Sequence, residues 1–150
     1  MTTAPRGMYF EEFEVGLIIH TAARTITETD IVNFAGLSGD FNFIHTDAEA
    51  AKDTPFGQRV AHGMLAASIS TGLGQTLGIF EGTTLALMGQ TFQYKAPVFF
   101  GDTIRLKLTV EQLKPSSKGG RGVVTFQSDI LNQDDSTAVT GTWTVMFRDA

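Results

Sequence analysis

The sequence has no cysteine, which excludes disulfide bonds, thiol nucleophiles and thiolate metal ligands. A chain without cysteine is compatible with a reducing compartment, and we expect this protein in the cytoplasm. Basic residues are also few, since 11 lysines and arginines stand against 16 acidic residues, for a formal net charge of −5. They are scattered along the chain, so we expect no basic face for nucleic acid. A few local cations could still hold an anionic ligand.

Long apolar runs are missing as well. Met1–Met8 lacks the apolar core of a signal peptide. Residues 61–80 carry no formal charge when His62 is neutral, but they include four glycines and several hydroxyl side chains. A membrane-spanning helix needs about 20 mainly apolar residues, so we expect a buried helix and no membrane contact. Without repeats or long linkers, the 150 residues suit a single domain over 1–150.

The first quarter of the chain predicts a strand followed by a helix. Residues 17–25, with three consecutive branched apolar residues, are typical of a strand. Thr27 and Asp30 have the spacing of a capping box, a reciprocal pair of hydrogen bonds at a helix start. Apolar residues at helical spacing follow, and Gly36 and Gly39 are expected to end that helix.

Two more helices are predicted before the middle of the chain. Thr46 and Glu49 repeat the capping box, which indicates a short helix to about Lys52. The segment 62–77 then predicts a long helix with no formal charge beyond its first residue. Because no face of this helix is charged, we expect protein to surround it.

The second half predicts antiparallel sheet. Strands are expected at 83–95, 103–114, 121–132 and 137–147. In 103–114 apolar and polar residues alternate, as in a half-buried strand. Short turns favour a meander of hairpins. A curved antiparallel sheet around a long buried helix satisfies this order, so the predicted class is α+β with the hot-dog arrangement.

The segment Ser38–His45 places a carboxylate, an amide and an imidazole close together. Histidine near neutral pH can accept or donate a proton, and a carboxylate can share that work. Asp40 and His45 are therefore a candidate catalytic pair, on an expected loop, with Asn42 as an orienting group. The alternative is that Asp40 caps a turn and His45 is a satisfied buried residue. Taken alone, this segment favours the alternative.

The segment Ala61–Leu65 begins the long predicted helix with Gly63 near its start. The first N–H groups of a helix have no internal partner and carry partial positive charge. A glycine there lets a ligand oxygen approach, which is an oxyanion hole in outline. The alternative is a glycine needed only for a tight joint between loop and helix.

Together the two segments resemble the hydratase-2 motif of the MaoC-like family, the (R)-specific enoyl-CoA hydratases. The resemblance is carried by SGDFNFIH at 38–45 and by FGQRVAHGML at 56–65, while YKAPVFFGD at 94–102 is similar to a later strand segment of the family. It covers nearly the whole chain in order and spacing. One departure is Phe43, where the motif commonly has proline, which bears on loop path and substrate size more than on reaction type.

The resemblance implies reversible addition of water to a trans-2-enoyl thioester, giving a (3R)-3-hydroxyacyl thioester. It implies that Asp40 and His45 hold and activate the water and supply a proton, that Asn42 supports them, and that the Gly63 N–H binds the thioester carbonyl. It implies no metal and no redox cofactor. The implied substrate is an acyl-CoA or acyl carrier protein thioester, and the implied assembly is a homodimer or higher homo-oligomer.

Other polar residues receive smaller roles. We expect His62 to support its loop, Ser68 and Thr71 to hydrogen-bond within their helix, and His20 to have no role. Three scattered histidines offer no spacing suited to a metal site. Four cations are candidates for contact with coenzyme A phosphates, or are simply solvated strand charges: Lys95, Arg105, Lys107 and Arg121.

Two other functions stay open on the sequence. Many hot-dog proteins are acyl-CoA thioesterases, which differ from hydratases because they release free thiol. A non-catalytic acyl-thioester binder is the third possibility, although intact Asp40, His45 and Gly63 argue against it.

Overall fold

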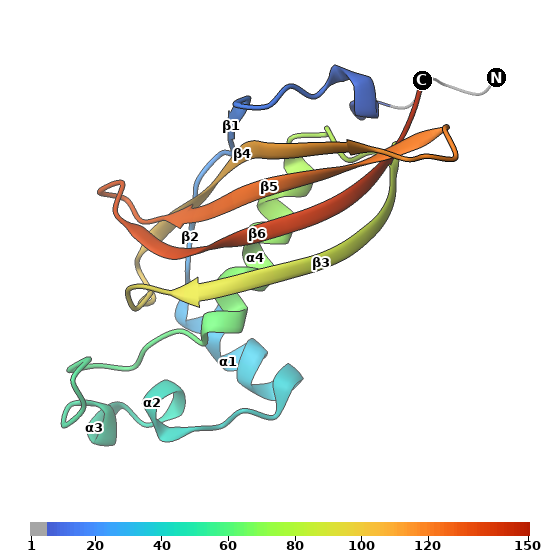
Figure 1. Ribbon diagram of the computed structural model, residues 1–150. Helices are drawn as coiled ribbons and strands as arrows, with labels where there is room; N and C mark the ends of the chain where they lie inside the picture. The colour runs from blue at the N-terminus through green and yellow to red at the C-terminus, as the bar shows by residue number, and fades with distance from the viewer. Residues whose placement is uncertain (1–5) are drawn as a thin grey trace.

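A curved antiparallel sheet wraps around one face of a long helix, α4, in this computed structural model (Figure 1). The structure describes residues 6–150, so most of the Met1–Met8 segment lies outside it. The elements are η1 (Phe10–Glu12), β1 (Ile18–His20), β2 (Arg24–Thr25), α1 (Glu28–Ser38), α2 (Phe43–Thr46), α3 (Ala48–Ala51), α4 (Gly63–Thr76), β3 (Thr84–Tyr94), β4 (Thr103–Pro115), β5 (Arg121–Leu131) and β6 (Thr137–Arg148). The predicted α+β class and hot-dog arrangement are confirmed.

The sheet has the strand order β1-β4-β5-β6-β3, with β2 also paired to β4. The hairpins β4–β5 and β5–β6 are those that the turns predicted. The expected position of β3 in the meander is wrong, because β3 pairs with β6 at the far edge and not with β4. The connection from β3 to β4 therefore crosses the end of the sheet. It passes the start of α4, where the Ala61 N–H donates to the Val98 carbonyl at 2.8 Å.

The core lies between the sheet and α4. The predicted alternation in β4 holds, since its inward residues are buried: Ile104, Leu106, Leu108 and Val110. They belong to the same cluster as Leu65, Ile69 and Leu73 of α4. Gly74 permits close approach here, because a Cβ on it would lie 3.2 Å from the Trp143 ring. Truncating one of these leucines to alanine should cost about 2–5 kcal/mol of stability.

The outer face of α4 is not covered within the described chain. Met64, Ser68, Thr71 and Gln75 are exposed along one stripe of the helix. The expectation that protein surrounds this helix is therefore only half right, because the sheet wraps one face alone. Among the helices of residues 6–150, none has the length and hydropathy required to cross a membrane.

The segment predicted as one strand at 17–25 is split into β1 and β2. The split occurs at Thr21, whose hydroxyl accepts a hydrogen bond from the Leu106 N–H at 2.9 Å in place of regular strand pairing. The start of α1 is as predicted, because Thr27 and Asp30 form both bonds of the capping box. The helix continues through Gly36 and ends at Gly39, whose φ of 77° is the left-handed conformation that glycine adopts readily.

Candidate active site

The loop expected to carry the catalytic pair contains a helical turn, α2, which includes His45. Asn42 begins this turn, because its side-chain oxygen accepts the N–H of Ile44 at 3.2 Å. The orienting role expected of Asn42 therefore acts on the backbone of α2. The location of His45 on a short helix corrects the prediction of an irregular loop.

The second predicted capping box, at Thr46 and Glu49, is wrong. Asp47 begins α3 instead, because its carboxylate accepts the N–H groups of Glu49 and Ala50 at 3.0 Å. The Thr46 hydroxyl turns back and donates to the carbonyls of the preceding turn. An aspartate directly before a helix competes well with a more distant threonine for its free N–H groups.

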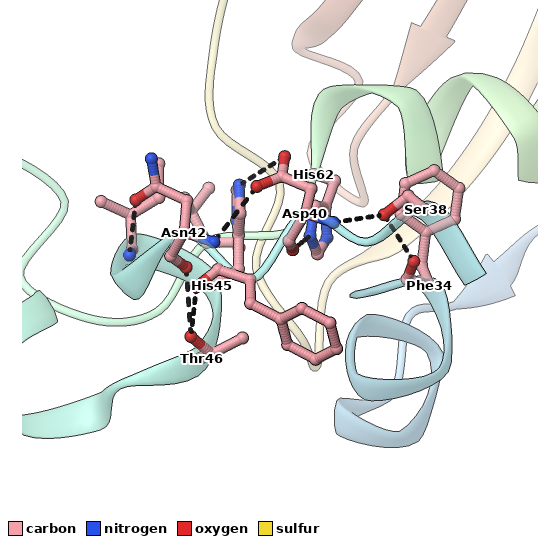
Figure 2. A network of polar contacts seen from close by, with 10 residues as sticks. Phe34, Ser38, Asp40, Asn42, His45, Thr46 and His62 are labelled. Carbon is pink, nitrogen blue, oxygen red and sulfur yellow. Dashed lines mark hydrogen bonds and ion pairs between the residues drawn. The ribbon is translucent and has the colours of Figure 1, made fainter. Parts of the chain in front are cut away.

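Asp40 and His45 face each other (Figure 2), with Asp40 Oδ2 4.0 Å from His45 Nε2. His45 is buried, and its Nδ1 lies 2.6 Å from the Val60 carbonyl oxygen. A carbonyl oxygen can only accept, so Nδ1 carries the hydrogen and donates it. In a neutral ring, Nε2 then carries a lone pair that is directed toward the Asp40 carboxylate.

The turn-capping alternative for Asp40 is also realised. Its Oδ1 accepts the Asn42 N–H at 3.1 Å, which is a local turn of the kind that aspartate forms readily. The other oxygen, Oδ2, stays directed toward His45, and about half of the Asp40 side chain is exposed. One carboxylate oxygen therefore holds the turn while the other is available for chemistry.

His62 lies against both members of this pair, which its sequence position did not reveal. Its ring stacks on the His45 ring with centroids 3.7 Å apart and planes at 24°. Its Nε2 lies 2.9 Å from the backbone oxygen of Asp40. Figure 2 marks this contact with a dashed line. Spacing along the chain gives no sign of this contact, because residues 45 and 62 are brought together only by the tertiary fold.

The description of the histidines as scattered is wrong for two of the three. Asp40, His45 and His62 each offer a ligand atom, and these atoms all lie within 4.8 Å of one another. Their orientation suits a metal ion poorly. A ligating imidazole directs its lone pair in the ring plane, and two nearly parallel stacked rings do not direct their lone pairs to one point. His20, the third histidine, lies exposed on β1.

A cavity of about 710 Å³ opens beside the pair. Polar groups in its wall include Asp40, His45 and His62, and Gly63 lies in the wall as well. Most of the lining is apolar, from residues of several elements: Phe34, Ile44, Phe56, Val60, Met64, Val98 and Val139. The arrangement places a carboxylate and an imidazole in the wall of a mostly apolar chamber.

Gly63 is the first residue of α4, so its N–H has no partner within the helix. A Cβ at this position would lie 2.5 Å from the Tyr94 ring, which sequence reasoning did not foresee. The Tyr94 hydroxyl donates to the Met64 sulfur at 3.3 Å across the same helix start. The alternative of a tight joint at Gly63 is therefore realised, and Gly63 also lines the cavity.

Of the four candidate cations, Lys95 alone lines the cavity. Arg105 pairs with Asp135, and the Lys107 ammonium lies 3.8 Å from Asp129. Arg121 begins β5, opposite the last residue of β6. Ser68 and Thr71 donate to carbonyls of their own helix, as predicted, and do not line the cavity.

Comparison with known proteins identifies the family to which this chain belongs. The MaoC like domain matches residues 15–130. An (R)-specific enoyl-CoA hydratase of Rhodospirillum rubrum is 41% identical over 121 residues, covering 80% of this chain and 78% of that protein. An (R)-specific enoyl-CoA hydratase of Aeromonas caviae is 34% identical over 135 residues, covering 89% of this chain and 95% of that protein.

Solved structures agree with the sequence relatives. A MaoC-like dehydratase from Rhodospirillum rubrum superposes with a TM-score of 0.84 at 29% identity, over 96% of this chain and 99% of that one. A Mycobacterium tuberculosis protein with a double hotdog fold superposes with a TM-score of 0.79, over 99% of this chain and 46% of that one. At 14% identity the latter similarity concerns the fold alone. Sequence and fold thus agree, and the chain belongs to the MaoC-like family.

Proposed function

We propose that this chain is an (R)-specific enoyl-CoA hydratase, acting as one domain over residues 1–150. The observation that carries the proposal is the 4.0 Å separation between Asp40 Oδ2 and His45 Nε2 in the wall of an apolar cavity. This separation is too long for a direct hydrogen bond, but it lets one water bond to both atoms. The hydratase relatives support the same reaction.

The proposed proton transfers follow from which atoms of the catalytic pair already form hydrogen bonds. Because His45 Nδ1–H is held by the Val60 carbonyl, Nε2 is the atom that can take a proton from the bridging water. The water oxygen then bonds to C3 of the enoyl group as the C2–C3 double bond opens. Asp40 orients the water, and C2 receives the proton that His45 Nε2 took from it, so Asp40 and His45 return to their starting states.

Negative charge reaches the thioester carbonyl during this addition. The Gly63 N–H, at the partially positive start of α4, is the group we assign to bind that oxygen. Addition of water changes no overall oxidation state, so the proposed reaction requires no redox cofactor. The carboxylate, the imidazole and the helix start together provide the proton transfers and the charge stabilisation.

We propose coenzyme A as the carrier, with Lys95 as its contact. Lys95 is exposed at the cavity wall, where an ammonium could meet a phosphate of the carrier. Lys95→Ala should raise KM for the CoA thioester and leave kcat near wild type. Lys107→Ala is the matched control, because Lys107 faces Asp129 and does not line the cavity.

We also propose that the chain forms a homodimer through β3. This strand is at the sheet edge, and it exposes large apolar side chains: Leu85, Leu87 and Met88. An exposed apolar edge strand in a monomer invites strand pairing with another chain. Sedimentation of wild type and of Leu87→Asp checks this, with a dimer expected for the first and a weakened dimer for the second.

The reaction itself is tested with crotonyl-CoA. Loss of the enoyl-thioester absorbance without free thiol is expected of a hydratase. Release of free thiol, followed with a thiol reagent in a parallel cuvette, would instead identify a thioesterase. No change in either signal with short, long and branched enoyl thioesters would identify a binder without activity.

A further inference from the structure

His62 contacts both proposed catalytic residues and also precedes the proposed oxyanion-binding glycine. It is 3% exposed, and its ring lies between the rings of His45, at 3.7 Å, and Phe34, at 5.1 Å. Its Nε2 bonds to the backbone oxygen of Asp40 at 2.9 Å. The next residue along the chain, Gly63, begins α4. One buried side chain therefore joins three parts of the site.

The protonation of the His62 ring follows from its partners. The Asp40 carbonyl can only accept, so Nε2 of His62 carries the donated hydrogen. The other ring nitrogen, Nδ1, is buried and has no hydrogen-bond partner within residues 6–150. A buried polar atom without a hydrogen-bond partner destabilises the folded protein, so a histidine at this position requires an explanation. An apolar residue of similar size would fill the space without that cost.

The two contacts of His62 act on different parts of the pair. The Asp40 N–H is held by the Ser38 hydroxyl at 3.2 Å, and the Asp40 carbonyl is held by His62. Both backbone groups of Asp40 are thus fixed, and from this fixed backbone its carboxylate is oriented by the Asn42 N–H, which donates to Oδ1. His45 is tethered at one ring edge by Val60, and a single tether still permits the ring to tilt. The stacked face of His62 blocks that tilt.

We infer that His62 is a positioning residue, which keeps the carboxylate of Asp40 and Nε2 of His45 at the separation that one water can bridge. The inference rests on the proposed hydration and extends it to a residue outside the reacting pair. An imidazole suits this task because it donates from its edge and stacks with its face. Phenylalanine offers the face without the donor, and glutamine offers a donor without the face.

Replacing His62 with phenylalanine or with glutamine tests the hydrogen bond to Asp40 and the stack on His45 separately. We expect His62→Phe and His62→Gln each to lower kcat by about 10- to 100-fold, the loss that a small misplacement of catalytic groups produces. KM for crotonyl-CoA should stay nearly unchanged, because His62 acts on the reacting pair more than on substrate binding. His20→Gln is the matched control, since it also removes one imidazole but lies exposed on β1, away from the cavity.

Proton NMR of His45 measures the stacking of its ring on His62 without depending on enzymatic activity. A ring stacked at 3.7 Å shields the His45 ring protons, so their resonances should move downfield in His62→Gln and much less in His62→Phe. Thermal unfolding followed by circular dichroism establishes that each variant is folded. If one variant does not fold, the other still tests its own contact.

Wild-type kcat in either folded variant would overturn the positioning role of the contact which that variant removes. A rise in KM with unchanged kcat would overturn it as well, because it would assign His62 to binding. If Asp40→Asn and His45→Gln are inactive while both His62 variants are fully active, the inference fails and the proposed function stands. If wild-type protein hydrates no enoyl thioester, the proposed function fails. Unchanged His45 resonances in His62→Gln would separately refute the stacking of His62 on His45.

Discussion

Asp40 and His45 approach to 4.0 Å, and each is held by a different backbone group: the Asn42 N–H binds one oxygen of Asp40, and the Val60 carbonyl binds Nδ1 of His45. Each side chain therefore has one atom held by a backbone hydrogen bond and one atom left for chemistry. Catalytic effects can therefore be separated from structural ones. A conservative replacement can keep the backbone hydrogen bond and remove the atom proposed to react.

Asp40→Asn is the replacement that makes this separation for the carboxylate. The amide oxygen can still accept the Asn42 N–H, so the turn should persist. The negative charge directed at His45 is lost, and we expect turnover with crotonyl-CoA to fall by about 10²–10⁴-fold. If Asp40 only capped its turn, the folded variant would keep wild-type activity.

His45→Gln tests the imidazole in the same way. Glutamine can donate to the Val60 carbonyl from its amide, but it cannot take a proton from water near neutral pH. We expect a loss of kcat of about 10²–10⁴-fold with an unchanged melting temperature. Substrate binding, measured by calorimetry with a non-reactive acyl-CoA, should persist. Full activity in the folded variant would remove His45 from the mechanism.

Gly63→Ala should damage the start of α4. The added methyl group would lie 2.5 Å from the Tyr94 ring, so the ring or the helix start must move. We expect a loss of about 1–3 kcal/mol in unfolding free energy, as for other overpacked sites, together with a lower kcat. Gly72→Ala is the control on the same helix. A Cβ there meets nothing within 4 Å, and alanine should stabilise this exposed helical position by about 0.5–1 kcal/mol.

Phe43→Pro tests the departure from the family motif. Phe43 is the first residue of α2, a position where proline is favoured, and Asn42 before it has φ −52° and ψ 136°, a ψ that suits a residue preceding proline. We expect stability to rise by about 0.4–1 kcal/mol and kcat with crotonyl-CoA to stay near wild type. Relative rates across short and long enoyl thioesters should change more than the maximal rate. Identical rate ratios would show that the loop path does not influence substrate size.

Asp30 gives a prediction for acid stability. Burial acts to raise its pKa, but hydrogen bonds from Thr27 and the nearby Arg24 outweigh burial and hold the pKa below its ordinary value of 3.8. The folded form thus binds this proton less readily than the unfolded chain. The stabilisation is therefore present above about pH 4 and is lost as pH falls through the folded pKa. Asp30→Asn should be less stable than wild type at pH 7, with a gap that narrows below pH 4 in urea titrations.

Much of this fold could be predicted because its signals are local. The Thr27–Asp30 box lies within one helical turn, and the alternation of β4 needs only its own residues. The position of β3 beside β6 could not be predicted, because strand pairing across the sheet leaves no mark on either strand alone. The stack of His45 and His62 was missed for the same reason, since it arises only when α2 and the start of α4 meet.

Contacts made by the main chain have a consequence for how this site tolerates sequence change. Val60 donates its N–H to the Ile44 carbonyl and accepts from His45 Nδ1, so it holds α2 without using its side chain. Any residue of similar size could keep both bonds, except proline, which has no N–H. Apolar residues of similar size should therefore be tolerated at position 60, which is buried, although this position anchors the proposed base. The tolerance of such apolar replacements would under-report the importance of position 60, whereas proline, which has no N–H, should release α2.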